Sequence, residues 1–256
     1  MKLQQKKSKK NITKWFFTLI ILGALAWGIT WATFARVPLP EAVKALESDG
    51  QIEVTQDPWL VFSPKRGQLE TGFIFYPGGR INPQGYATLM RAIALEGTLV
   101  VVPNMPINMA VFNANVADDI MAYFPDIEDW VIGGHSVGGT MAAQYAHQHP
   151  ELVKGLVIWA SYPAENANLS NYDIPVLSIY GTLDPRVNDD SIRERKHLLP
   201  DDTQYTRIEG GDHHQFGSYE IKPGEHFATI NRDSQQREII QATLNLLRIV
   251  AINENE

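Results

Sequence analysis

The feature that most constrains the fold of this chain is a serine between glycines, in the stretch Gly-Gly-His-Ser-Val-Gly-Gly at residues 133–139. A short apolar run, residues 129–132, leads into the stretch, and small residues compatible with a helix follow from Gly138. This order predicts a strand, a sharp turn and a helix, with Ser136 at the tip of the turn and its hydroxyl exposed. A side chain at Gly134 or Gly138 would collide with the neighbouring strand or helix. Ser136 is therefore a candidate nucleophile.

Two backbone N–H groups near this turn are candidates for stabilising a developing oxyanion. The helix after Ser136 directs its N-terminus at the reacting centre, so the Val137 N–H is one expected donor. The second is expected from the loop after the apolar run 72–76, which continues Pro-Gly-Gly-Arg. The glycine pair lets the backbone approach a substrate closely. Gly79 is the predicted donor, and Arg80 is the second choice.

Apolar runs and helical stretches alternate along the rest of the chain. Strands are expected at residues 51–56, 59–62, 72–76, 98–102, 129–132, 155–159, 176–180 and 204–208. Helices are expected at residues 41–47, 83–95, 109–123, 138–147, 191–198 and 234–249. This alternation predicts an α/β fold with a mostly parallel central sheet and helices on both faces. The connection from 160 to 175 is short, so we expect no large lid over the site.

A nucleophilic serine needs a base, and the base needs an acid that orients it. Asp184 directly follows the strand expected at 176–180, although Asp-Pro is also a common turn sequence. Two adjacent histidines, His213 and His214, follow the last expected strand. Adjacent side chains do not share one face of a helix, as a helical metal pair requires, so we expect no metal and no cofactor. The base is therefore one of these two histidines.

Other residues are expected around the pocket. His135 is the variable residue of the serine turn, and we interpret it as structural or as a wall of the pocket. Four apolar side chains are hypothesised to line the pocket, namely Met105, Met109, Phe112 and Phe216.

The N-terminus has the pattern of a membrane anchor. Residues 1–14 carry six lysines and no acid, and the 21 residues 15–35 carry no charge. As a helix, such a segment spans about 31 Å, close to the ~30 Å hydrocarbon core of a bilayer. Lysines before the segment favour a cytoplasmic N-terminus. We therefore expect a basic cytoplasmic tail at 1–14, a transmembrane anchor at 15–35 and an extracytoplasmic domain at 38–256. A cleaved signal peptide is the alternative, because Ala-Leu-Ala at 24–26 is a small-x-small triplet.

Composition excludes several classes of function. Beyond residue 14 the chain has 16 basic and 29 acidic residues, a net charge of −13. An acidic domain argues against nucleic-acid binding, which needs a basic face for the phosphates. The chain has no cysteine, which excludes disulfides, thiolate metal sites and a cysteine nucleophile.

Four motifs carry a resemblance to a known family. They are Tyr76-Pro-Gly-Gly-Arg80, Gly133-Gly-His-Ser-Val-Gly-Gly139, Ser178-Ile-Tyr-Gly-Thr182 followed by Asp184, and Gly210-Gly-Asp-His-His-Gln-Phe-Gly217. Together they resemble the α/β-hydrolase superfamily, specifically its bacterial membrane-anchored or exported branch related to the dienelactone-hydrolase-like proteins. That branch usually carries Gly-Gly-Asn-His at the last motif, so the resemblance favours His213 over His214. Dienelactone hydrolases proper use a cysteine nucleophile, and Ser136 removes that specific activity.

The residues and the resemblance together predict a membrane-anchored serine hydrolase with an α/β-hydrolase fold. Ser136 is expected to attack an acyl carbonyl, His213 to move the proton and Asp184 to orient His213. A small-molecule or surface-presented ester is the expected substrate, since an alcohol leaves more easily than an amine. Two alternatives remain open, an acyltransferase of the cell envelope and a non-catalytic membrane-tethered binding module.

Overall fold

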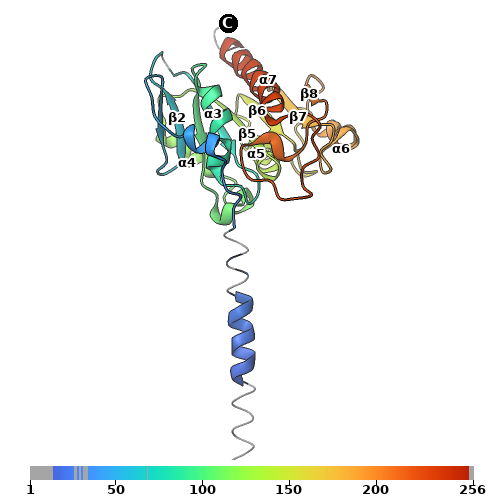
Figure 1. Ribbon diagram of the computed structural model, residues 1–256. Helices are drawn as coiled ribbons and strands as arrows, with labels where there is room; N and C mark the ends of the chain where they lie inside the picture. The colour runs from blue at the N-terminus through green and yellow to red at the C-terminus, as the bar shows by residue number, and fades with distance from the viewer. Residues whose placement is uncertain (1–13, 26–27, 29, 31–33, 68, 254–256) are drawn as a thin grey trace, which may run out of the picture. The chain divides into compact units, whose positions relative to one another are not determined.

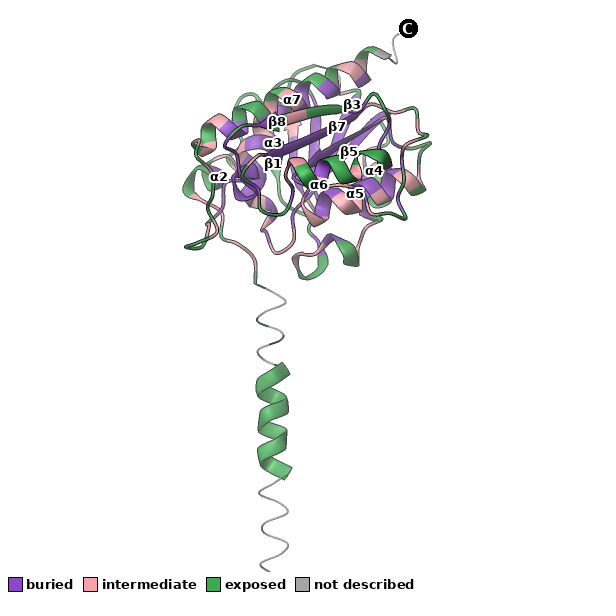
Figure 2. Cartoon of the chain, turned by 90° about the vertical axis from the view of Figure 1, so that its right-hand side faces the viewer, coloured by how far each residue is buried: buried purple, intermediate pink, exposed green. Residues whose placement is uncertain are grey.

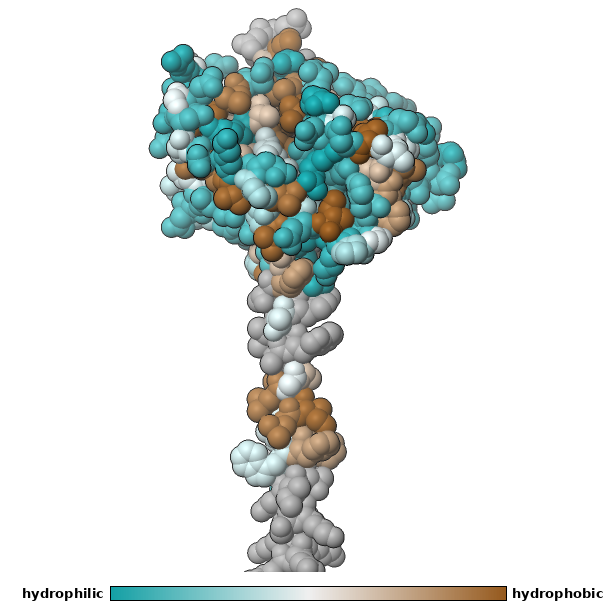
Figure 3. Space-filling view, in the orientation of Figure 1, coloured by the Kyte–Doolittle hydropathy of each residue, from teal (hydrophilic) through white to brown (hydrophobic). Residues whose placement is uncertain are grey.

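The computed structural model describes residues 14–25, 28, 30, 34–67 and 69–253. The chain divides into two compact units, Met1–Phe34 and Ala35–Glu256. In the first unit, residues 14–25 are helical and their apolar side chains are exposed (Figure 3). Within the described residues, no helix has both the length and the apolar character needed to cross a membrane. Residues 1–13 of the expected tail and residues 26–27, 29 and 31–33 of the expected anchor lie outside the described residues.

A single eight-stranded sheet forms the centre of the second unit (Figure 1). Its strand order is β1-β2-β4-β3-β5-β6-β7-β8. The bounds are β1 Ile52–Thr55, β2 Leu60–Pro64, β3 Thr71–Tyr76, β4 Leu99–Val102, β5 Asp129–His135, β6 Gly155–Trp159, β7 Val176–Gly181 and β8 Gln204–Ile208. β2 runs antiparallel to β1 and β4, and every other neighbouring pair is parallel. The sheet is therefore mostly parallel, as expected.

Helices cover both faces of this sheet (Figure 2). They are α2 Pro40–Lys44, α3 Ala87–Ala94, α4 Val116–Tyr123, α5 Val137–Gln148, α6 Asp189–Arg195 and α7 Arg232–Asn253. Alternate residues of β3 face opposite layers, because successive strand side chains point to opposite faces. Phe73 and Phe75 pack in the core beneath α3 and α7, whereas Ile74 and Tyr76 pack in the core beneath α4 and α5. The apolar runs read from the sequence are these doubly covered strands.

The strand pattern is confirmed, and two local differences bear on the site. β5 continues to His135, three residues beyond its expected end, so that Ser136 follows the strand directly. The helix expected at 109–123 begins only at Val116. Before it, the chain forms two short 3-10 turns, and Ile107 and Asn108 adopt left-handed backbone angles with φ of 45° and 56°. Inside the expected range, Met109 and Asn113 have non-helical φ of −137° and −154°, which delays the helix to Val116.

Candidate active site

Ser136 occupies the sharp turn between β5 and α5. Its backbone has φ 53° and ψ −126°, which is unfavourable for a residue other than glycine. Two hydrogen bonds hold it there. The Ser136 N–H donates to the Trp159 carbonyl at 3.0 Å, and the Ser136 carbonyl accepts from the Ser161 hydroxyl at 2.7 Å. Neighbouring strand β6 and the residues after it therefore fix the strained turn.

The glycines on either side of Ser136 are required by close packing. A Cβ atom on Gly138 would lie 2.2 Å from the carbonyl oxygen of Tyr76, and one on Gly134 would lie 2.5 Å from the carbonyl carbon of Gly138. Backbone atoms cannot give way as a flexible side chain can. The collision expected from the sequence is thus confirmed, and it involves β3 as well as the helix.

The structure pairs Asp184 with His213. Asp184 Oδ2 lies 2.6 Å from His213 Nδ1, and the two side chains are 0% and 5% exposed. Asp184 Oδ1 accepts the N–H groups of Arg186 and Val187 at 2.8 and 3.1 Å. A carboxylate held on both oxygens fixes Nδ1 as the proton donor, which leaves Nε2 of the neutral ring as an acceptor.

The neighbouring His214 is placed differently. Its ring packs edge-on against those of His213 and Tyr219, and its Nδ1 is buried without a hydrogen-bond partner in the described part of the chain. Burial, then the charges of Arg36, His213 and Arg186, lowers the pKa of His214 to about 4. Of these two histidines, only His213 therefore has a carboxylate partner within the described residues, as a general base requires.

Asp212 precedes His213, at the position where the branch that the sequence resembles usually has asparagine, and it has a separate set of partners. Its Oδ1 accepts the N–H groups of His214 and Gln215, and its Oδ2 accepts those of Phe227 and Ala228. Oδ2 also lies 3.0 Å from the ring of His226. Burial raises the pKa of Asp212, but these backbone donors outweigh it and hold the pKa below its usual value. Asp212 therefore ties the histidine loop to residues 226–228.

The expected oxyanion donors lie on the same pocket as Ser136. Val137 is the first residue of α5, and its N–H has no hydrogen-bond acceptor among the described residues, nor has that of Gly79. The N–H groups on either side of Gly79 are already occupied. Gly78 donates to the Tyr86 hydroxyl at 2.9 Å, and Arg80 donates to the Asn108 carbonyl at 2.7 Å. Arg80, the second choice from the sequence, is therefore not available as a donor.

His135 joins three parts of the site. Its Nε2 lies 3.1 Å from the His213 carbonyl, which can only accept, and its Nδ1 lies 2.8 Å from the Tyr86 hydroxyl. Burial, followed by the charges of His213 and His214, lowers the pKa of His135 and keeps the ring neutral. Tyr86 therefore donates to His135 and accepts from Gly78. This chain of hydrogen bonds links the Gly78–Gly79 loop, the serine turn and the histidine loop, a role that the sequence did not reveal.

A cavity of about 280 Å³ brings these groups together. It is lined by Arg36, Gly79, Arg80, Ile81, Met109, His135, Ser136, Val137, Arg186, His213 and His214. No direct hydrogen bond joins Ser136 Oγ to His213 in the described residues, and such contacts often tighten only when substrate binds. Of the four apolar residues hypothesised to line the pocket, only Met109 does so. Phe216 is buried behind it, with its ring stacked on that of His135 at 5.5 Å.

Sequence reasoning missed two arginines of this cavity. Arg36 directly follows the expected anchor and Arg186 lies two residues beyond Asp184, and no motif marks either as part of a site. Their common location depends on long-range packing. Arg36 reaches the site because residue 36 pairs with Ile81 and Pro38 pairs with Tyr219 in isolated β-bridges. In the described residues, no group of three or more His, Asp or Glu side chains could hold a metal ion.

Three solved structures illustrate the same fold. Est1E from Butyrivibrio proteoclasticus, solved with ferulic acid bound, is 12% identical with a TM-score of 0.55, over 76% of this chain and 98% of that one. The esterase domain of a Rhodothermus marinus protein is 14% identical with a TM-score of 0.57, over 77% and 96%. A soluble variant of monoglyceride lipase from Saccharomyces cerevisiae, in complex with a substrate analogue, is 11% identical with a TM-score of 0.57, over 80% and 96%.

Sequence comparison gives the family directly. No curated protein matches the chain. The model of the alpha/beta hydrolase family matches residues 72–237, which include the serine turn, Asp184 and His213. That match covers more than half of the chain and agrees with the strand order and the strained serine turn. The chain therefore belongs to the alpha/beta hydrolase family.

Proposed function

We propose that this protein is a serine hydrolase that cleaves carboxylic esters through an acyl-enzyme. The observation that carries the proposal is the buried Asp184–His213 pair, with 2.6 Å between the carboxylate and Nδ1, on the same cavity as Ser136. The N–H groups of Val137 and Gly79 on that cavity, which have no acceptor among the described residues, support it further. The esterase domain and the lipase of the same fold favour an ester among acyl substrates.

The proposed reaction has two halves. Ser136 Oγ attacks the acyl carbonyl while His213 Nε2 takes the hydroxyl proton, and the carbonyl oxygen becomes an oxyanion held by the Val137 and Gly79 N–H groups. The ester C–O bond then breaks, and His213 returns the proton to the departing alcohol. Water attacks the acyl-enzyme with His213 again as base, which releases the acid and restores Ser136. Asp184 stabilises the imidazolium formed in each half.

A fluorophosphonate probe tests the proposal on the full-length chain purified in detergent. An activated serine displaces fluoride from phosphorus and becomes covalently labelled, so the wild type is expected to be labelled and Ser136→Ala is not. Ser170→Ala is the matched control, because Ser170 lies outside the cavity and should leave labelling unchanged. A folded wild type that is not labelled, or labelling that persists in Ser136→Ala, would remove the nucleophile from the proposal.

We also propose that residues 15–35 anchor the protein in the cytoplasmic membrane, with the hydrolase domain on the outer side. The support is the sequence pattern, six lysines followed by 21 uncharged residues. Protease added to spheroplasts that express the chain is expected to digest the domain, while a cytoplasmic marker protein survives. Full protection of the domain until the membrane is permeabilised would contradict this topology.

A further inference from the structure

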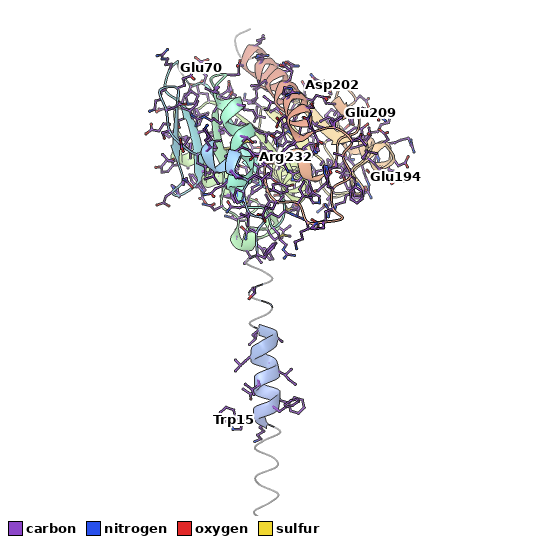
Figure 4. All side chains as sticks on the ribbon, viewed as in Figure 1. Trp15, Glu70, Glu194, Asp202, Glu209 and Arg232 are labelled. Atoms are coloured by element: carbon purple, nitrogen blue, oxygen red, sulfur yellow. The ribbon has the colours of Figure 1, made fainter. Side chains whose placement is uncertain are left out.

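The cavity that holds Ser136 has a charge opposite to that of the domain around it. Beyond residue 14 the chain carries a net charge of −13. Figure 4 labels four of its acids, Glu70, Glu194, Asp202 and Glu209, at the periphery of the folded body, and all four are exposed. The cavity, in contrast, is lined by three arginines and by no aspartate or glutamate within the described residues. Positive charge is therefore concentrated where a substrate would enter.

Arg36 is held in a fixed position at this cavity. Its guanidinium bonds Glu225 Oε2 at 2.8 Å and the Glu220 carbonyl at 3.2 Å, and it lies 5.9 Å from the centre of the Tyr219 ring. Although burial raises the pKa of Glu225, the Arg36 guanidinium outweighs it and lowers that pKa. The charge of Arg36 is thus balanced by one carboxylate, and its guanidinium forms a fixed wall of the cavity.

Arg186 and Arg80 line the same cavity as Arg36. Within the described residues, Arg186 forms no ion pair, and its backbone N–H is fixed by Asp184 Oδ1 at 2.8 Å. The Arg80 backbone is held on both sides, since its N–H donates to Asn108 at 2.7 Å and its carbonyl accepts from the Arg36 N–H at 2.8 Å. Both arginines therefore stand on loops that also carry parts of the proposed catalytic machinery.

His214 supplies a second observation that points to a ligand. Its side chain lines the cavity, is 6% exposed and has a buried Nδ1 with no hydrogen-bond partner among the described residues. Buried polar atoms of native proteins are nearly always paired, and an unpaired one calls for an explanation. A neutral imidazole beside three guanidiniums can donate one N–H to a bound anion.

We infer that the substrate is an ester carrying a carboxylate or phosphate close to the scissile acyl group, held by Arg80, Arg186 and His214 against the wall that Arg36 forms. The inference rests on the proposed ester hydrolysis and names its substrate class. A guanidinium binds a carboxylate or phosphate through two parallel hydrogen bonds, and the positive cavity also attracts the anion from solution. The cavity of about 280 Å³ fits a small acid rather than a long acyl chain.

Two matched pairs of esters test the inference on the full-length protein. In the first pair, mono(4-nitrophenyl) adipate carries the anion on the acyl side, and its primary amide is the neutral analogue. In the second pair, 4-acetoxybenzoate carries the anion on the alcohol side, with 4-acetoxybenzamide as the analogue. We expect kcat/KM to favour the anionic member of at least one pair by about 10-fold, equivalent to ~1.4 kcal/mol. The preference should appear mainly in KM and should fall with added salt.

Variants that remove a positive charge test whether the preference for anionic esters arises in the cavity. Arg186→Gln and Arg80→Gln are each expected to lower the anionic-to-neutral ratio of kcat/KM several-fold. Arg248→Gln is the matched control, because Arg248 pairs with Glu96 and does not line the cavity, so the ratio should stay at the wild-type value. An unchanged ratio in both cavity variants, with folding verified by thermal melting, would overturn the assignment.

The outcomes separate this inference from the function on which it rests. If the neutral esters are cleaved as well as the anionic ones, the inference fails and the hydrolase proposal stands. If no ester is cleaved and the fluorophosphonate does not label Ser136, the hydrolase proposal itself fails. Fatty-acid release from phosphatidylglycerol vesicles, compared with phosphatidylcholine vesicles, distinguishes an anionic lipid from a soluble acid as the source of the substrate.

Discussion

Replacing His213 with alanine is expected to lower kcat for ester hydrolysis by a factor on the order of 10⁵–10⁶, since removal of the base in such a triad costs nearly as much as removal of the whole triad. The structure gives the reason for choosing this histidine. Among the histidines that line the cavity with Ser136, His213 alone has its Nδ1 on a buried carboxylate in the described part of the chain, at 2.6 Å from Asp184. Steady-state kinetics with a 4-nitrophenyl ester would measure the loss.

The control for this variant is another histidine. His197→Ala removes an exposed imidazole that bonds the Glu194 carbonyl and lies outside the cavity, so it should keep wild-type activity. Thermal melting must show that His213→Ala remains folded. If His213→Ala retained activity within 10-fold of wild type while His214→Ala lost it, the base would be His214 and the proposed geometry would be wrong.

Much of the fold was predictable because it depends on local patterns. The strands β3 to β7 are buried along their whole length and stand out as continuous apolar runs. The more exposed β1, β2 and β8 were identified as well. The predicted start of the helix at 109–123 was wrong, because the apolar residues before Val116 are also compatible with a helix. Non-helical backbone angles at Met109 and Asn113 delay that helix to Val116, and no local signal predicts them.

The reacting groups were easier to predict than their surroundings. Ser136 directly follows β5, and Asp184 and His213 lie three and five residues beyond the ends of β7 and β8. Parallel strands bring their carboxyl ends to one edge of the sheet, so sequence position alone indicates where these residues lie. Their catalytic roles stay predictions until they are measured. Gly79 was predicted in the same way, because it lies in the loop after a parallel strand. The structure adds that the N–H groups of Gly78 and Arg80 already donate hydrogen bonds within the protein.

The contacts that support the site could not be predicted in this way. The hydrogen bonds from Tyr86 to His135 and from His135 to the His213 carbonyl connect residues 49 and 78 positions apart. The charge of the cavity depends on Arg36 and Arg186, which are 150 positions apart in the sequence. Such pairs carry no spacing signal, because packing of distant segments brings them together. A single sequence therefore indicates the chemistry of the site better than its specificity.

Asp184→Asn is expected to lower kcat by about 10⁴-fold while the fold and KM stay close to wild type. Backbone N–H groups around residue 184 determine which way the asparagine amide is oriented. Asp184 Oδ1 accepts two N–H groups, from Arg186 and Val187, and an asparagine can satisfy them only by placing its oxygen there. Its NH₂ group then faces His213 Nδ1 and donates to it.

A donor opposite Nδ1 moves the proton of the neutral His213 ring to Nε2. Nε2 can then no longer accept the proton of Ser136, so the nucleophile is not activated although every backbone contact of the loop is kept. Asp202→Asn, a change to an exposed carboxylate outside the cavity, is the matched control and should leave kcat unaltered. Pre-steady-state measurement of the alcohol released in the first turnover would locate the loss in acylation. A decrease of less than 10-fold in Asp184→Asn would mean that the Asp184–His213 contact does not set the protonated nitrogen.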